Sequence, residues 1–223
     1  MFIKHGIEPI FSDYIMGHKN YSSPANYEPN SDEHQHILAA MLGDGCLIKP
    51  YKKSKTYRMV WNMGNKSHAL HKAEAFKFLG AKYQKKVNPG FGAEWHCVVT
   101  GCHPLLDMYS EKYGNSKGLT SGSGIASELN SLGWAVYYGD DGHLDRVTGT
   151  CFLHTEGLEA DMVSDIAKAV NEFIGHDAAV VFSYVGGAKK RKMKCIRIKK
   201  NGSKIFMEKI KKHMAAGMEY KIL

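Results

Sequence analysis

Aspartates precede a glycine at two places in the chain. Asp44 lies in "LGDG" (42–45) and Asp141 in "GDDG" (139–142), each at the end of an apolar run typical of a helix. A carboxylate at the C-terminal end of a helix is disfavoured by the helix dipole, by about 0.3–1 kcal/mol when exposed. If the two helices pack together, the two carboxylates repel each other unless a cation intervenes, and their oxygen atoms suit Mg²⁺. The sequence thus predicts a shared divalent-metal site.

The order of predicted elements is repeated along the chain. Asp141 follows Asp44 by 97 residues, and "FIG" at 173–175 follows "FLG" at 78–80 by 95 residues. Either Asp-Gly alone is typical of a turn into the next hairpin. Two of them, at the ends of corresponding helices in a duplicated unit, favour a shared functional role instead.

Each repeat is predicted to contain three helices and two hairpins, in the order α-β-β-α-β-β-α. The hairpin in 46–63 has one apolar face, made of Met59, Trp61 and Met63. The helix in 65–80 has an apolar stripe, made of Leu70, Ala73, Phe76 and Leu79. The histidine pairs in the helices are interpreted as structural or solvent-facing; they are His34 with His36 and His68 with His71. We expect an α+β fold with an arm at 1–31, a first half at 32–115, a linker at 116–127 and a second half at 128–223.

The composition indicates a basic protein with a packed core. The 223 residues include 30 Lys and Arg against 22 Asp and Glu, which gives a net charge of +8 and suggests a polyanionic partner. Five scattered cysteines fit reduced thiols better than a disulfide framework. The apolar runs are shorter than the roughly 20 residues that a membrane helix needs, and the N-terminus lacks a signal-peptide pattern. We therefore expect an intracellular protein that does not enter membranes and is not secreted.

Two motifs resemble those of a known family. "ILAAMLGDG" (37–45) and "WAVYYGDDG" (134–142) are similar to the two LAGLIDADG motifs of single-chain homing endonucleases. The resemblance extends from residue 32 to the C-terminus. It implies a fold of two pseudosymmetric halves, whose antiparallel sheets form a DNA-binding saddle, and a site-specific endonuclease of a mobile genetic element that cuts both strands of duplex DNA.

The resemblance also assigns residues to the site. In that family the last aspartate of each motif binds divalent metal, which here implies Asp44 and Asp141 with Mg²⁺ or Mn²⁺, and Asp140 as a second choice. Basic active-site residues of the family match Lys117 in "SKGL" and, with a closer pattern, Lys221 in "MEYKIL". Carboxylates that hold metal and lysines that neutralise charge are the residue types that phosphodiester hydrolysis needs.

The hairpins carry the residues predicted to bind DNA, because a two-stranded ribbon fits the major groove. In the first half these are Lys49, Lys52, Lys53, Lys55, Arg58, Lys82, Lys85 and Lys86, and in the second half Lys189, Lys190, Arg191, Lys192, Lys194, Arg197 and Lys199. Any one of them is a better candidate for a phosphate contact than for a base contact. Because the two halves differ in sequence, we expect a monomer that recognises a long, asymmetric duplex.

Two other functions stay open. One is an RNA-splicing maturase or a non-cleaving nucleic-acid-binding protein on the same scaffold; the other is a basic structural module in which Asp-Gly only forms turns. Retention of both Asp44 and Asp141 favours cleavage. The ending "YKIL" lacks the His-Asn of an intein, so we expect a free-standing or intron-encoded protein.

Overall fold

The computed structural model describes residues 31–87, 94–115, 118–119, 122–186 and 191–222. The rest of the predicted arm, and Lys117, Lys189 and Lys190, lie outside the described residues. The first half contains α2 (Asp32–Leu42), β1 (Cys46–Ile48), β2 (Arg58–Met63), α3 (Lys66–Ala75), η1 (Lys77–Leu79), β3 (Lys82–Val87), β4 (Glu94–Val99) and α4 (Pro104–Tyr113). The second half contains α6 (Ser131–Asp141), β7 (Gly142–Asp145), β8 (Thr150–His154), α7 (Ala160–Ile174), β9 (Ala179–Gly186), β10 (Arg191–Ile198), α8 (Lys200–Ile210), η2 (Lys211–His213) and η3 (Glu219–Lys221).

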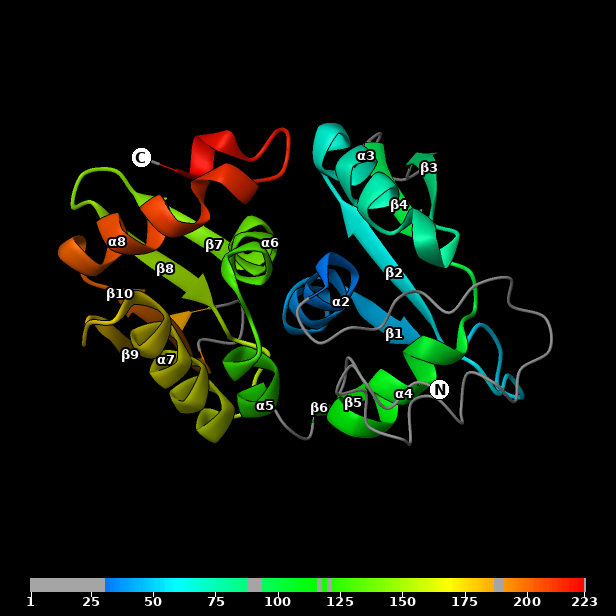
Figure 1. Cartoon of the computed structure of the whole chain (residues 1–223), viewed down its shortest axis with the longest axis horizontal. Helices are drawn as coiled ribbons and strands as arrows, with labels where there is room; N and C mark the ends of the chain where they lie inside the picture. The colour runs from blue at the N-terminus through cyan, green and yellow to red at the C-terminus, as the bar shows by residue number, and fades with distance from the viewer. Residues whose placement is uncertain (1–30, 88–93, 116–117, 120–121, 187–190, 223) are drawn as a thin grey trace, which may run out of the picture.

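The two halves share one sheet topology. One sheet has the strand order β1-β2-β4-β3 and the other has β7-β8-β10-β9, and all neighbouring strands are antiparallel. Figure 1 shows the halves side by side, with α2 and α6 next to each other in the middle. The predicted duplicated α+β fold is confirmed by this repetition.

The two central helices begin alike. The Ser31 hydroxyl accepts a hydrogen bond from the amide of His34 at the start of α2, and the Asn130 side chain accepts from the amides of Leu132 and Gly133 at the start of α6. Such caps satisfy amides that have no partner within the helix. Both helices are 11 residues long, and the aspartates lie at their C-terminal ends: Asp44 two residues beyond α2, and Asp141 as the last residue of α6.

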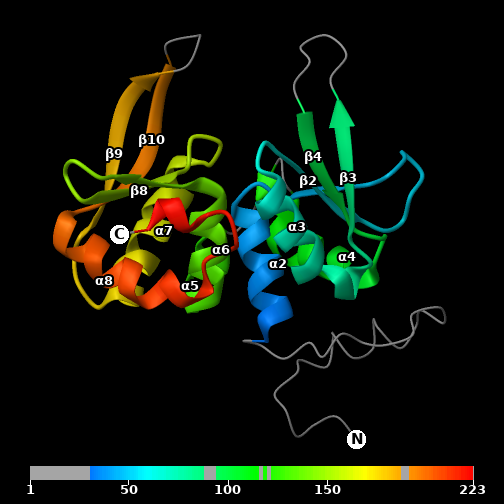
Figure 2. The same ribbon diagram turned by 90° about the horizontal axis from the view of Figure 1, so that it is seen from above.

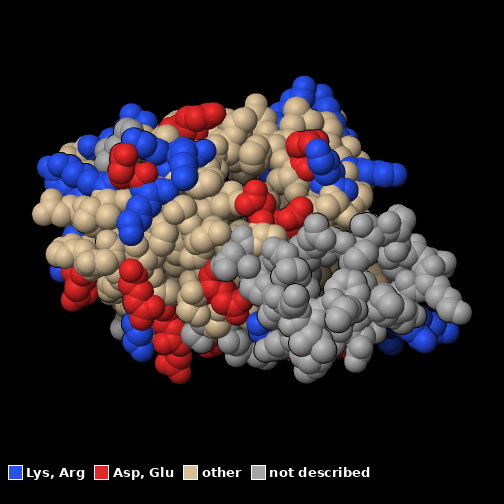
Figure 3. All heavy atoms as spheres, in the orientation of Figure 1, with Lys and Arg blue, Asp and Glu red and all other residues tan. Residues whose placement is uncertain are grey.

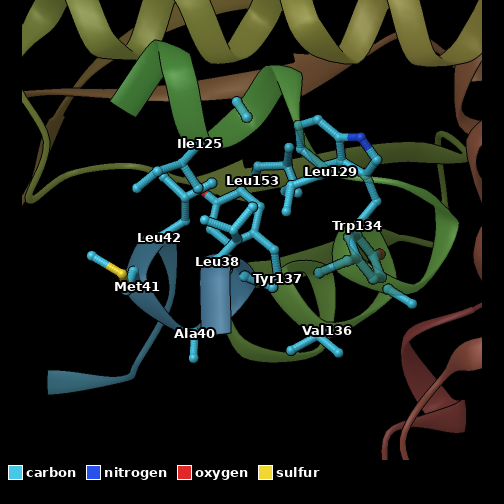
Figure 4. Packing of buried hydrophobic residues seen from close by; sticks show 14 of the residues in the cluster. Leu38, Ala40, Met41, Leu42, Ile125, Leu129, Trp134, Val136, Tyr137 and Leu153 are labelled. Carbon is cyan, nitrogen blue, oxygen red and sulfur yellow. The ribbon is translucent and has the colours of Figure 1, made fainter. Parts of the chain in front are cut away.

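The core of the molecule lies around these two helices. Leu38, Ala40 and Leu42 of α2 and Trp134, Val136 and Tyr137 of α6 are buried there, as Figure 4 shows. The helices α2 and α6 approach closely at Gly133, where an added Cβ would lie 2.4 Å from the side-chain oxygen of Gln35. That oxygen accepts a hydrogen bond from the amide of Asn130, while the Gln35 amide donates to the carbonyl of Glu128. Side chains of the first half therefore hold the start of the second half's central helix.

The segment between the halves has structure of its own. It contains the short strands β5 (Gly114–Asn115) and β6 (Gly118–Leu119) and the helix α5 (Gly122–Ser127). Ile125 and Ala126 of α5 are buried in the shared core. Part of the predicted linker thus packs against the central helices.

The second helix of each half ends in the same way. The helical segments 66–79 and 160–174 are followed by Gly80 and Gly175, with φ of 66° and 69°. This left-handed conformation favours glycine. The predicted apolar stripe in the first of these helices is partly wrong, because Leu70 is 45% exposed while His68, Ala69 and Lys72 are buried. The buried face of α3 also carries a charged residue, Lys72, whose partner is described below.

The sheets have one face against helices and one face away from them. The predicted apolar face of the first sheet is confirmed, since Met59, Trp61 and Met63 are buried and Trp61 packs against Phe76. The hairpins β3–β4 and β9–β10 extend to the same side of the molecule, beyond the helices, in Figure 2. No helix among the described segments is long and apolar enough to cross a membrane.

Candidate functional site

Asp44 and Asp141 lie together at the junction of the two halves. Asp44 follows Gly43, the C-terminal cap of α2, and Asp141 is the last residue of α6. Both line a cavity of about 320 Å³, whose wall also includes His154 and Glu156. The packing of α2 on α6 therefore brings the aspartates of the two motifs to one place, as the repeat in the sequence predicts.

Burial and mutual repulsion raise the pKa of both carboxylates. Burial, and then the charges of Asp44 and Asp140, raise the pKa of Asp141 to about 8, against weaker lowering by Lys221 and Lys72. Burial and the charge of Asp140 likewise raise the pKa of Asp44. Carboxylates crowded in this way favour a bound cation, which would replace the protons.

Lys221 lies at the acidic end of α6. Its Nζ donates hydrogen bonds to the carbonyls of Gly139 (2.7 Å) and Asp140 (3.3 Å). Burial lowers the pKa of Lys221, and the charges of the three aspartates act against that change. The Tyr138 hydroxyl donates to the carbonyl of Lys221 (3.0 Å), so the C-terminal segment is fixed to α6 at two points. A cation at the negative end of a helix dipole offsets the cost of ending a helix in aspartates.

Asp140 faces away from that cavity and into the protein. Its side chain is 0% exposed, and Lys72 Nζ donates to Oδ2 at 2.7 Å. Oδ1 lies 3.4 Å from His68 Nε2 and accepts no hydrogen bond from the described residues. The neighbouring backbone is close, since a Cβ added to Gly43 would lie 2.7 Å from Oδ2. The carboxylate of Asp140 is thus engaged by α3, whereas Asp44 and Asp141 line the cavity.

Sequence reasoning missed Lys72 and His68. The interpretation of the histidines as structural or solvent-facing did not place His68, which is only 3% exposed, beside a carboxylate. Burial, together with the charges of Lys72, Lys221 and His71, lowers the pKa of His68 to about 3, so it is neutral near pH 7. The available signal was a lysine at the helical spacing of Ala69 and Phe76, on a face that otherwise packs in the core.

Of the three aspartates at this junction, Asp44 and Asp141 line the cavity and Asp140 does not. Within the described part of the chain, no group of three or more His, Cys, Asp or Glu side chains could hold an ion. Mg²⁺ commonly takes one or two protein carboxylates and completes its shell with water and phosphate oxygens. The donor set of Asp44 and Asp141 fits that chemistry.

The basic residues predicted to contact DNA fall on different faces of the first sheet. Strand pairing aligns Lys82 with Val99 and Lys86 with Trp95 on the face away from the helices, which also carries Arg58. Lys85 lies on the opposite face and forms an ion pair with Glu94. In the segment between β1 and β2, Lys49, Lys52, Lys53 and Lys55 are exposed. The outward face of this sheet is thus basic, but not all of the predicted lysines belong to it.

The second sheet differs in the chemistry of its outward face. Arg197 lies there, with its guanidinium 5.4 Å from the ring centroid of Phe182, and Phe182 stacks on Tyr184. Lys194 alternates with Arg197 and faces the other way, while Lys199 is exposed directly before α8. The side chains of Arg191 and Lys192 lie outside the described part. Among the described side chains, this face thus combines an arginine with two aromatic rings, whereas the outward face of the first sheet carries Arg58, Lys82 and Lys86.

Basic residues also occur away from the sheets. On the face drawn in Figure 3, Lys and Arg gather around the C-terminal helices of the second half and around α3, with Asp and Glu between them. The net charge of +8 is consequently spread over the molecule rather than confined to one surface.

Comparisons with known proteins agree on the fold. A sequence model of the LAGLIDADG DNA endonuclease family matches residues 35–206. The solved structure of the homing endonuclease I-WcaI bound to its DNA recognition sequence is 17% identical, with a TM-score of 0.71 over 98% of this chain and 94% of that one. A variant of the homing endonuclease I-DmoI, in complex with its target DNA in the presence of manganese, is 14% identical, with a TM-score of 0.55 over 86% of this chain and 100% of that one.

A third similar structure is not described as a homing endonuclease. Full-length DUF199/WhiA from Thermatoga maritima is 10% identical, with a TM-score of 0.52 over 90% of this chain and 61% of that one. No curated protein matches the sequence. At these identities the structural likenesses establish the fold, and the sequence model alone establishes the relationship.

Proposed function

The chain belongs to the LAGLIDADG DNA endonuclease family, and we propose that it is a site-specific endonuclease that hydrolyses duplex DNA with divalent metal held by Asp44 and Asp141. The observation that carries this proposal is the meeting of the two aspartates at the ends of α2 and α6, in one cavity. A protein that only bound nucleic acid would not need two mutually repelling carboxylates at that junction.

The metal is proposed to be Mg²⁺ or Mn²⁺. Bound between Asp44 and Asp141, it would supply activation of water and stabilisation of charge on the phosphate. The structures of I-DmoI in the presence of manganese, magnesium and calcium support the use of a divalent ion by a related fold. Asp140 as a further ligand stays a prediction.

The remaining groups of the site have roles that follow from their places. Lys221 fixes the end of α6, and its ammonium group adds positive charge beside the carboxylates. We assign it the neutralisation of charge that develops on the phosphate. Lys117 is proposed for a similar role from its sequence pattern alone.

The proposed substrate is one long duplex bound by a single chain. The two outward sheet faces would each contact one half of the site, and their different chemistry supports an asymmetric sequence. I-WcaI and I-DmoI were solved with their DNA targets, which supports duplex DNA as the ligand of this fold.

The test is incubation of the protein with a randomised duplex library and Mg²⁺, followed by sequencing of the cut ends. We expect one extended sequence to be enriched around the cuts, and no cuts with EDTA. Cleavage of no duplex, together with tight binding to structured RNA, would instead support the splicing maturase.

A further inference from the structure

The ion pair between Lys72 and Asp140 joins the two halves of the molecule next to the aspartate cavity. Lys72 belongs to α3 of the first half, and Asp140 to α6 of the second. Their side chains are 3% and 0% exposed, and Nζ lies 2.7 Å from Oδ2. The ammonium group of Lys72 also lies 5.7 Å from the ring centroid of Trp61, so aromatic and acidic groups both enclose it.

The pseudosymmetric position, with the roles of the two halves exchanged, has no such pair. Asp140 corresponds to Gly43, because each precedes the aspartate of its motif. Lys72 lies eight residues before Gly80, and Ala167 lies eight before Gly175. Ala167 is buried at 6% exposure. Both members of the pair are therefore replaced by small residues in the other repeat, and the ion pair exists on one side of the pseudosymmetric interface only.

Stability alone is a poor reason for this arrangement. Transfer of two charges into the protein interior costs about as much as their attraction returns, and apolar residues of similar size are often equally stabilising. At the pseudosymmetric position the same interface is formed with Gly43 of the first half and Ala167 of the second half, without any charged pair. The distinguishing feature of the pair is its position, because Asp140 is bonded directly to Asp141.

The contacts of Asp140 fix it from two directions. Its side chain is held by Lys72, and its main-chain carbonyl accepts a hydrogen bond from Lys221. Gly43 leaves the space that its carboxylate occupies. With side chain and carbonyl both held, the direction in which the next residue leaves the helix is determined.

We propose that Lys72 and Asp140 are a positioning pair, which fixes the end of α6 so that the carboxylate of Asp141 faces Asp44. This inference rests on the proposed function, because it assigns the pair to the geometry of the same metal site. The pair acts through Asp141, because neither of its side chains lines the cavity. Groups of this kind typically change metal affinity or activity by about 10–100-fold when they are removed.

Two double variants test the pair. Lys72→Ala with Asp140→Gly installs the residue types of the pseudosymmetric position, where Ala167 and Gly43 stand. Lys72→Met with Asp140→Asn removes both charges and keeps the side-chain volumes similar. We expect each to bind the selected duplex with unchanged Kd and KM, while Mn²⁺ affinity, measured by electron paramagnetic resonance on protein without DNA, and kcat both fall by about 10–100-fold. The control is Asp165→Asn with Lys168→Met, which removes an exposed ion pair of α7 and should change none of these.

The outcomes separate the possible roles. A folded double variant with the wild-type Mn²⁺ affinity and kcat would overturn the proposal and leave the pair a purely structural contact. A loss of Mn²⁺ in Asp140→Asn alone, with normal Mn²⁺ binding in Lys72→Met, would also overturn it, because Asp140 would then be a ligand. Failure of the proposed function itself has a different signature: Mn²⁺ binding would not respond to Asp44→Asn or Asp141→Asn.

Discussion

Asp141 ends its helix close to two other carboxylates, which explains why its proton is held so tightly. Burial and the charges of Asp44 and Asp140 raise its pKa to about 8 from its ordinary value of 3.8. The ionised form is thus less stable in the folded protein than in the unfolded chain. A divalent ion reverses this preference, because it interacts favourably only with the ionised carboxylates.

A pH dependence of stability follows for the metal-free protein. Below about pH 4 Asp141 is protonated in both states, and as the pH rises from about 4 to about 8 only the unfolded chain releases the proton readily. The folded protein should therefore lose stability across this window, and Asp141→Asn should not share that loss. In thermal unfolding with EDTA, the Tm of the wild-type protein should fall relative to the Tm of Asp141→Asn between pH 5 and pH 8. Parallel Tm curves for the two proteins would contradict the raised pKa.

Individual site residues were partly predictable. Asp44, Asp141 and Lys221 could be found because each belongs to a short motif that can be recognised in the sequence without knowledge of the fold. Lys72 has no motif. Its role depends on α3 of one half meeting α6 of the other, and the partner of a buried charge becomes visible only once that contact is known.

The central helices depend on small residues where they approach. Gly43 follows α2, and its amide donates to the carbonyl of Ala39. A Cβ on Gly43 would lie 2.7 Å from Oδ2 and 2.9 Å from the Cβ of Asp140, which is anchored to Lys72. The carboxylate cannot move aside without breaking that ion pair.

Gly43→Ala is accordingly expected to destabilise the fold by about 1–3 kcal/mol, the usual cost of overpacking a close contact. Gly64→Ala is the matched control, because a Cβ there would meet nothing within 4 Å. Denaturant unfolding followed by circular dichroism measures both. Equal stability of the two variants would show that the C-terminal ends of α2 and α6 can move apart without cost.

The order of elements was predictable, and the rotation of α3 about its axis was not. Helix N-caps, glycines that end helices, and the alternation of apolar and polar residues in strands are local signals, and they occur in both halves. The stripe of Leu70, Ala73, Phe76 and Leu79 fitted a helical period, but the buried face of α3 includes Lys72 and leaves Leu70 exposed. The hydrophobic pattern alone gives no sign of the ion pair that the buried lysine forms with Asp140.

At the level of the whole molecule, the two outward sheet faces differ. The first carries Arg58, Lys82 and Lys86 together with the exposed Trp95, and the second carries Arg197, Phe182 and Tyr184. The prediction of basic hairpins identified the surface but not which lysines share a face. That depends on strand register, since a shift of one residue exchanges the two faces.

Lysines on the two faces of β3 should contribute differently to DNA binding. Lys82→Ala and Lys86→Ala should each weaken binding and reduce the slope of log Kd against log salt by about 1, as expected for loss of a phosphate contact. Lys85→Ala is the control on the same strand, because Lys85 lies on the other face and is paired with Glu94. Fluorescence anisotropy over a salt series measures this, and an equal effect of all three would show that the whole hairpin contacts DNA.

The central claim is that Asp44 and Asp141 together hold the metal that cleaves DNA. The most direct measurement compares Mg²⁺-dependent nicking of the selected duplex by wild type, Asp44→Asn and Asp141→Asn, with binding of the same duplex measured in parallel. The account predicts that each substitution abolishes nicking while the Kd for the duplex stays close to that of wild type. Unchanged nicking in both variants would contradict it and would reduce the two Asp-Gly sequences to ordinary turns.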